Sequence, residues 1–94
     1  MYRILLLLFI TKIGFGQTNI SGIIYDGQTN ETLIGANIII QGENNGTSTN
    51  YEGKFTILTN KDLPIEIIIS YLGYEDKSIT IEDDIGLQIK LFPN

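Results

Sequence analysis

Cysteine and histidine are both missing from this 94-residue chain. Without cysteine, the chain has no disulfide, no thiolate metal site, no cysteine nucleophile and no lipid-modified cysteine. Without histidine, it has no imidazole general base, no Ser-His-Asp triad and none of the usual zinc sites. These absences exclude most familiar catalytic centres, so we expect a protein that is not an enzyme and that holds no cofactor or metal.

The first sixteen residues differ in composition from the rest. A basic residue precedes the unbroken apolar run Ile4–Ile10, and a small-x-small pattern follows at Gly14–Gly16. This order is typical of a secretory signal peptide. The run is too short for a transmembrane helix, which needs about 20 residues. We therefore predict a signal peptide at 1–16 and one exported domain at 17–94, with a buried N-terminal strand as the alternative for the first segment.

The predicted domain is acidic and small. Residues 17–94 contain four lysines against eleven acidic residues, a net charge of −7. Phosphate binding needs clustered cations, so we expect no nucleic-acid partner. A domain of this size with neither disulfides nor metal lies near the limit at which one core stabilises a fold. We expect it to depend on a neighbour, either a partner protein or further polypeptide.

The pattern of the domain is that of short strands separated by turns. β-Branched residues recur in short runs bounded by Gly, Asn and Asp, and no segment after residue 16 has a helical period. We expect strands at 19–26, 36–41, 47–49, 54–58, 65–71, 74–81 and 87–91. This spacing predicts an all-β sandwich or small barrel, and we favour a seven-stranded sandwich with sheets of three or four strands.

The pattern also predicts three details of these strands. Gly22 interrupts the first strand, which predicts a bulge or close backbone packing. Ile39 breaks the alternation of the second, so we expect its outer face to be partly covered. The strand at 65–71 should be the most buried.

Six aromatic residues admit two interpretations. They could form a platform for sugars or peptides, or they could be ordinary core and edge residues with hydroxyl groups at the surface. We favour the second. The residues are Tyr25, Tyr51, Tyr71, Tyr74, Phe55 and Phe92.

The acidic residues also admit two interpretations. Glu82, Asp83 and Asp84, with Asp62 or Asp26, could gather around calcium. No EF-hand spacing is present, so we favour separately solvated carboxylates. Nothing in the sequence positions two acids across a cleft, as glycoside hydrolysis requires.

Four blocks of the sequence, taken in order, resemble a known family. They are ISGIIYD at 20–26, ETLIGANI at 31–38, GTSTNYEGKF at 46–55 and ISYLGYE at 69–75. In these blocks the chain resembles the carboxypeptidase-regulatory-like domain, and more narrowly the N-terminal extension of SusC-type TonB-dependent outer-membrane receptors of Bacteroidetes. The resemblance covers nearly all of 17–94 and implies a transthyretin-like or Ig-like β-sandwich without an active site.

The signature residues would then have structural roles. Gly35 and Ala36 would permit close approach at the start of a strand, Gly46 and Gly53 would supply turns, and Gly73 a corner. The complete set is Gly22, Gly35, Ala36, Gly46, Gly53, Phe55, Gly73 and Tyr74.

The resemblance implies a non-catalytic periplasmic accessory or interaction domain, associated with the outer membrane. It would be the N-terminal part of a TonB-dependent nutrient receptor or a partner to its plug or barrel, reached through an exposed edge strand. The alternatives are a carbohydrate- or peptide-binding or peptidase-associated module that uses exposed tyrosines, and a spacer without ligand or partner. Such a receptor continues into a plug and a barrel beyond the residues present here, so a leading segment and a free-standing module both stay open.

Overall fold

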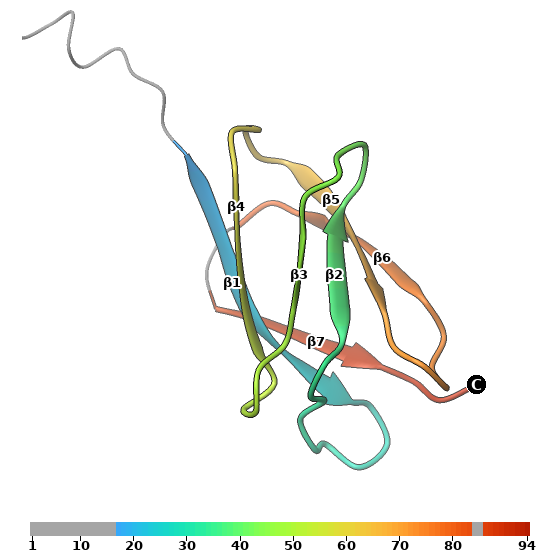
Figure 1. Cartoon of the computed structure of the whole chain (residues 1–94). Coiled ribbons are helices and arrows are strands. Elements are labelled where there is room, and N and C mark those ends of the chain that lie inside the picture. The colour runs from blue at the N-terminus through green and yellow to red at the C-terminus, as the bar shows by residue number, and fades with distance from the viewer. Residues whose placement is uncertain (1–16, 84–85) are drawn as a thin grey trace, which may run out of the picture.

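Two β-sheets pack face to face in the computed structural model, which describes residues 17–83 and 86–94 (Figure 1). The predicted signal peptide at 1–16 lies outside the described residues, as does Asp84. Within the described ranges, regular structure consists of strands, and no helix there has the length and apolar character needed to cross a membrane. The prediction of an all-β fold is confirmed.

The described residues form seven strands, as the sequence predicts. They are β1 (Thr18–Asp26), β2 (Asn37–Ile40), β3 (Gly46–Ser48), β4 (Lys54–Thr59), β5 (Ile65–Ser70), β6 (Lys77–Ile81) and β7 (Leu87–Leu91).

The strands divide into sheets of three and four. β1 is the central strand of the sheet β4-β1-β7, and β2 and β5 are the inner strands of the sheet β3-β2-β5-β6. All pairs are antiparallel except β1 with β7, which is parallel. Odd-numbered strands run toward the lower end of the sandwich in Figure 1, and even-numbered strands run back.

This topology assigns each loop to one end. We call "lower end" the loops 27–36, 49–53 and 71–76 together with residues 92–94. We call "upper end" the loops 41–45 and 60–64.

Alternating side chains form the core between the sheets. Along β4, Phe55, Ile57 and Thr59 are buried while the residues between them are exposed. The side-chain period of two in a strand produces this pattern whenever one face of a sheet meets another sheet. The core consists of Ile20, Ile24, Leu33, Ala36, Ile38, Ile40, Phe55, Ile57, Ile65, Ile67, Ile69, Ile81, Ile89 and Leu91.

The second and fifth strands agree with their predicted faces. Ala36, Ile38 and Ile40 are fully buried, whereas Ile39 is 44% exposed. Ile39 lies opposite Ile68 of β5 on the outer face, so the neighbouring strand supplies cover there. In β5 no residue except Glu66 is exposed, as expected for an inner strand.

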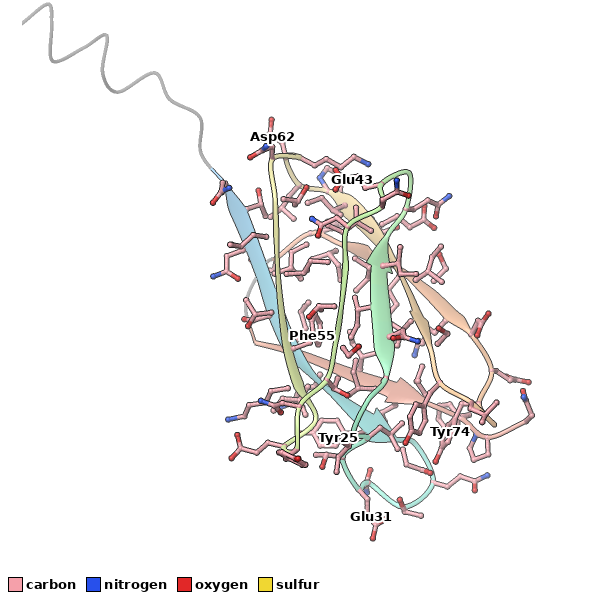
Figure 2. The ribbon with its side chains drawn as sticks, in the orientation of Figure 1. Tyr25, Glu31, Glu43, Phe55, Asp62 and Tyr74 are labelled. Atoms are coloured by element: carbon pink, nitrogen blue, oxygen red, sulfur yellow. The ribbon has the colours of Figure 1, made fainter. Side chains whose placement is uncertain are left out.

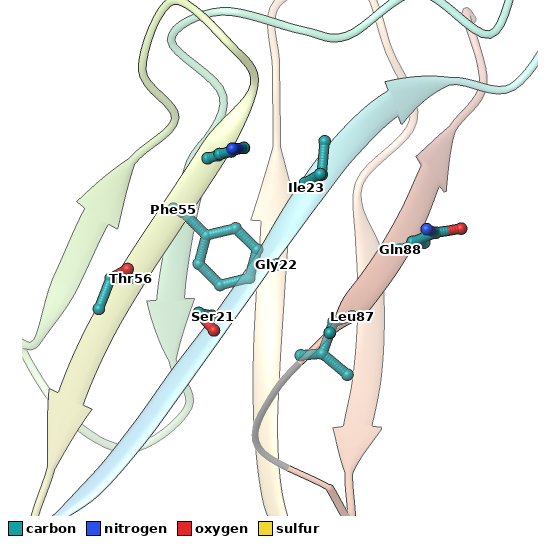
Figure 3. Close-up of a pocket in the computed structure, with 9 residues that line it drawn as sticks. Ser21, Gly22, Ile23, Phe55, Thr56, Leu87 and Gln88 are labelled. Atoms are coloured by element: carbon teal, nitrogen blue, oxygen red, sulfur yellow. The ribbon is translucent and has the colours of Figure 1, made fainter.

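Gly22 is a site of close packing and not of a bulge. Its register with β4 continues without interruption from Thr18 to Ile23. A Cβ atom on Gly22 would lie 2.7 Å from Leu87 Cβ and 3.0 Å from the Phe55 ring. Figure 3 shows this ring lying over Gly22, with Leu87 on the neighbouring strand. The missing side chain lets the Phe55 ring enter the core above β1.

The sixth strand begins later than predicted. β6 starts at Lys77, and Tyr74 instead forms an isolated bridge opposite Pro93. The ladder with β5 reaches only from Ile65 to Ile69, paired with Ile81 to Lys77. Contacts with the C-terminal residues therefore hold Tyr74 outside the β5–β6 ladder.

Phe55→Ala should lower the free energy of unfolding by about 3–5 kcal/mol, because it empties the space over Gly22. Leu58→Ala, on the outer face of the same strand, should change it by less than about 0.5 kcal/mol, because Leu58 is 48% exposed. Urea unfolding followed by circular dichroism measures both. Equal losses would show that the inner and outer faces of β4 are wrongly assigned.

Gly53→Ala should destabilise the fold more than Gly35→Ala. Both glycines have positive φ, 77° and 83°, where alanine is strained by about 1 kcal/mol. Only at Gly53 would the new Cβ also meet a neighbour, at 2.6 Å from Thr32 Cβ, which adds about 1–3 kcal/mol of overpacking. Thermal unfolding of the two variants side by side measures the difference, and a greater loss for Gly35→Ala would contradict this packing.

Candidate interaction surface at the lower end

The acidic residues considered for calcium, apart from Asp84, which lies outside the described residues, do not form one cluster. Figure 2 shows Asp62 at the upper end, whereas Asp26 ends β1 at the lower end. Glu82 and Asp83 are exposed after β6. Among the described residues no group of three or more acidic side chains could hold a metal ion.

The six aromatic residues do not form one platform. Phe55 is in the core at 3% exposure, and Tyr71 and Tyr74 are half-buried with ring centroids 5.4 Å apart. Tyr51 is 88% exposed in the β3–β4 loop. Packing rather than a shared binding face therefore accounts for most of these rings.

A shallow pocket of about 240 Å³ lies beside Gly22 (Figure 3). Its polar lining comes from Ser21, Thr56 and Gln88, and its one charged lining residue is Lys54. The lining thus combines hydroxyl and amide groups with one cation and contains no carboxylate.

Asp26 organises the lower end. It occupies an inward-facing position of β1, in step with Ile20 and Ile24, and is only 7% exposed. Its Oδ1 atom accepts hydrogen bonds from the backbone N–H groups of Gln28, at 2.7 Å, and Thr29, at 3.0 Å. A buried carboxylate is tolerable only with such donors. These bonds fold the first turn of the β1–β2 loop around the side chain.

The same carboxylate joins the two sheets. The hydroxyl group of Tyr74, in the β5–β6 loop, donates to Asp26 Oδ2 at 2.6 Å. This bond, with the two backbone donors, lowers the pKa of Asp26 below its ordinary 3.8, although burial opposes the shift. The bond in turn raises the pKa of Tyr74 above 10.0, because loss of its proton would place two negative charges together.

Thr49 ties the start of β2 to the end of β3. It is 5% exposed, and its hydroxyl group accepts a bond from Ala36 N–H at 2.9 Å and donates to Leu33 O at 2.6 Å. Backbone bonds between Thr49 and Gly35 and between Thr49 and Ala36 lie beside it. Each buried polar atom of the threonine is thereby paired.

The C-terminal residues lie against the same end. The ring of Phe92 fills the space that a side chain on Gly27 would need. Glu75 N–H donates to Phe92 O at 2.9 Å, and Asn94 N–H donates to Gly73 O at 3.0 Å. The β5–β6 loop and residues 92–94 are therefore held together.

Most signature residues of the sequence gather at the lower end. Gly35, Ala36, Gly53, Gly73 and Tyr74 are in its loops. Gly22 and Phe55 meet within the three-stranded sheet.

At two glycines one of the expected roles is absent. A Cβ on Gly35 would meet nothing within 4 Å, so its positive φ, and not close approach, requires glycine there. Gly46 is the first residue of β3, and the positive φ of the β2–β3 turn falls on Gly42. A Cβ on Gly46 would lie 3.0 Å from Ile38 O, so close packing with β2 is its constraint.

Sequence reasoning missed Asp26 and Thr49 as organising residues. A signal for Asp26 was present, because a carboxylate in step with buried isoleucines must find donors, and Asp followed by Gly favours a side-chain-capped turn. Thr49 gave no such signal, since its partners lie 13 and 16 residues earlier.

Stability should fall at both extremes of pH through the Asp26–Tyr74 pair. The lowered pKa of Asp26 stabilises the fold above pH 3.8, and this contribution is lost as the pH falls through the folded-state value. The raised pKa of Tyr74 stabilises it below pH 10.0, and this is lost as the pH rises through the folded-state value.

Tyr74→Phe should remove the pair's loss of stability at alkaline pH and weaken its loss of stability at acid pH, because the hydroxyl donor disappears while the ring remains. Melting temperatures measured from pH 2 to pH 12 for the parent, Tyr74→Phe, Asp26→Asn and the double variant would show it. The two substitutions should be non-additive; strict additivity would mean that the bond does not couple the loops.

Comparison with known proteins shows the family. Residues 20–93 match the CarboxypepD_reg-like domain. The chain is similar to the TonB-dependent receptor SusC of Bacteroides thetaiotaomicron, at 32% identity over 95 residues and 96% of this chain. It is also similar to the TonB-dependent receptor P26 of Formosa agariphila, at 33% identity over 61 residues and 65% of this chain. It spans only 9% and 6% of the lengths of these receptors.

Solved structures agree on the fold. The C-terminal domain of the shaft pilin SpaA from Lactobacillus rhamnosus GG superposes with a TM-score of 0.60 at 13% identity, covering 84% of this chain and 99% of that domain. The longer SpaA structure gives the same score over 47% of its chain. At this identity the likeness concerns the sandwich alone. Because the family match extends over nearly all the described residues, the chain belongs to the CarboxypepD_reg-like domain family.

Proposed function

We propose that this chain is a periplasmic accessory domain at the N-terminal side of a TonB-dependent outer-membrane receptor. The observation that carries the proposal is the match to SusC along 96% of this chain within only 9% of that receptor. The chain resembles the N-terminal region of such receptors, and its domain family is typically non-catalytic. The domain would be exported by residues 1–16 and would act on the receptor rather than on a substrate.

The packing supports an accessory role. The buried polar groups at the lower end bond within the domain. Thr49 connects the ends of two loops, and Asp26 connects the β1–β2 loop with Tyr74 of the other sheet's loop. Tyr74 uses its hydroxyl group within the domain, which leaves Tyr51 as the tyrosine most available to a sugar or peptide. A binding module based on several tyrosines is therefore the weaker candidate.

The proposal predicts the size and place of the cellular product. An antibody against residues 17–94 should detect, in fractionated cells of the source organism, an outer-membrane polypeptide about ten times longer than this chain. The same antibody should detect no periplasmic species smaller than the 10.5 kDa of the 94 residues. A single small periplasmic product would instead identify a free-standing module and overturn the proposal.

A further inference from the structure

Exposed apolar side chains concentrate at the lower end. Of the six large hydrophobic side chains that are exposed among the described residues, four lie there: Ile34 at 49%, Tyr51 at 88%, Leu72 at 97% and Phe92 at 47%. The other two, Ile39 and Leu58, lie on the outer faces of strands. Single exposed apolar residues are common, but a group on one end of a domain indicates an interaction surface.

Hydrogen bonds within the domain hold the loops that carry Tyr51 and Leu72. The turn before β4 is closed by Asn50, whose Oδ1 atom accepts bonds from Glu52 N–H at 2.9 Å and Lys54 N–H at 3.0 Å. Beside Leu72, Tyr74 N–H donates to Tyr71 O at 3.0 Å. A surface held in place before binding loses little conformational entropy when a partner docks.

The apolar residues are accompanied by negative charge. Glu31, Glu52, Glu75 and Asp76 are exposed in the same loops or beside them. The loops of the lower end contain no lysine or arginine. The cations beside them are Lys54, which forms an ion pair with Glu52 at 3.6 Å, and Lys77 and Lys90, which line one hollow with Glu75 and Asp76. A complementary surface would therefore have an apolar centre and basic side chains around it.

Both edges of the three-stranded sheet, β4 and β7, are less suited to docking than the sequence suggests. On one side, Lys77 Nζ donates to Lys90 O at 3.1 Å, so a lysine of β6 occupies an acceptor of the β7 edge. On the other side, Asn45 Nδ2 binds Leu58 O, so the β2–β3 turn occupies an acceptor of the β4 edge. Lysines and covering loops are devices that prevent strand addition.

The position of the last residues identifies the occupant. Phe92 is part of the exposed group, and Asn94 is bonded to Gly73 beside Leu72. In a receptor, the polypeptide that follows residue 94 would start at this surface, and tethering would give it a high effective concentration there. We propose that the lower end docks against the receptor polypeptide that follows residue 94, through an apolar surface rimmed by basic side chains; this inference rests on the proposed function.

Cysteine labelling of the full-length receptor tests the docking. Leu72→Cys and, as the matched control, Leu58→Cys each introduce a thiol at an exposed leucine, 97% and 48% exposed in the domain itself. Membranes carrying each variant would be treated with a maleimide, and labelling of the peptide with the new thiol followed by mass spectrometry. If the docked state is populated about nine-tenths of the time, the thiol at position 72 should react with the maleimide about tenfold more slowly than in an undocked receptor. It should also react more slowly than the control thiol at position 58.

A charge reversal separates docking from incidental shielding. The double substitution Glu75→Lys and Asp76→Lys should raise the labelling rate at position 72 toward the control rate, because the two new lysines would repel a basic partner surface. The labelling rate at position 58 should stay unchanged. Faster labelling at position 72 than at position 58 in the unaltered receptor, or no response to the charge reversal, would overturn the inference while leaving the receptor assignment intact. A labelled product no larger than the 10.5 kDa of the 94 residues would overturn the proposed function, and with it this inference.

Discussion

The hydrogen bond from the Tyr74 hydroxyl group to the buried carboxylate of Asp26 is the interaction on which the lower end depends. It joins the three-stranded sheet, through the end of β1, to a loop of the four-stranded sheet. The same carboxylate folds the β1–β2 loop by accepting two backbone bonds. Because burying it without donors would be unfavourable, the two loops and the sheet junction form one coupled unit.

The two ends of the sandwich differ in chemistry. The upper end is closed by polar contacts such as Lys61 Nζ to Gln41 O at 3.0 Å and Thr59 Oγ1 to Glu43 Oε2 at 3.2 Å. The lower end has its polar groups satisfied inside and apolar side chains outside. An end that is hydrogen-bonded within and exposes apolar side chains among carboxylates is suited to holding a neighbour, which connects the stability of this small domain with its proposed place in a receptor.

Much of the fold could be predicted because strand patterning is local. The inward residues of β2, β4 and β5 alternate with outward ones, so their faces and approximate limits follow from the period of two. The start of β6 could not be predicted, since Tyr74 satisfies the apolar pattern but is held by Pro93 and Asp26. Gly35 and Gly46 were recognised as glycines with a structural reason, but only the structure shows that positive φ without a close neighbour requires Gly35, whereas packing against Ile38 O requires Gly46.

The sequence by itself determined the class of the protein: an all-β chain divided into seven strands and carrying a family signature. These properties are local, because alternation, turn residues and absent residue types are visible one segment at a time. Only the tertiary structure decided that Asp26 meets Tyr74, 48 residues away, and that four exposed apolar residues from separate loops share one end. Both depend on which strands pair and in which direction, since contacts between distant segments exist only after the chain has folded.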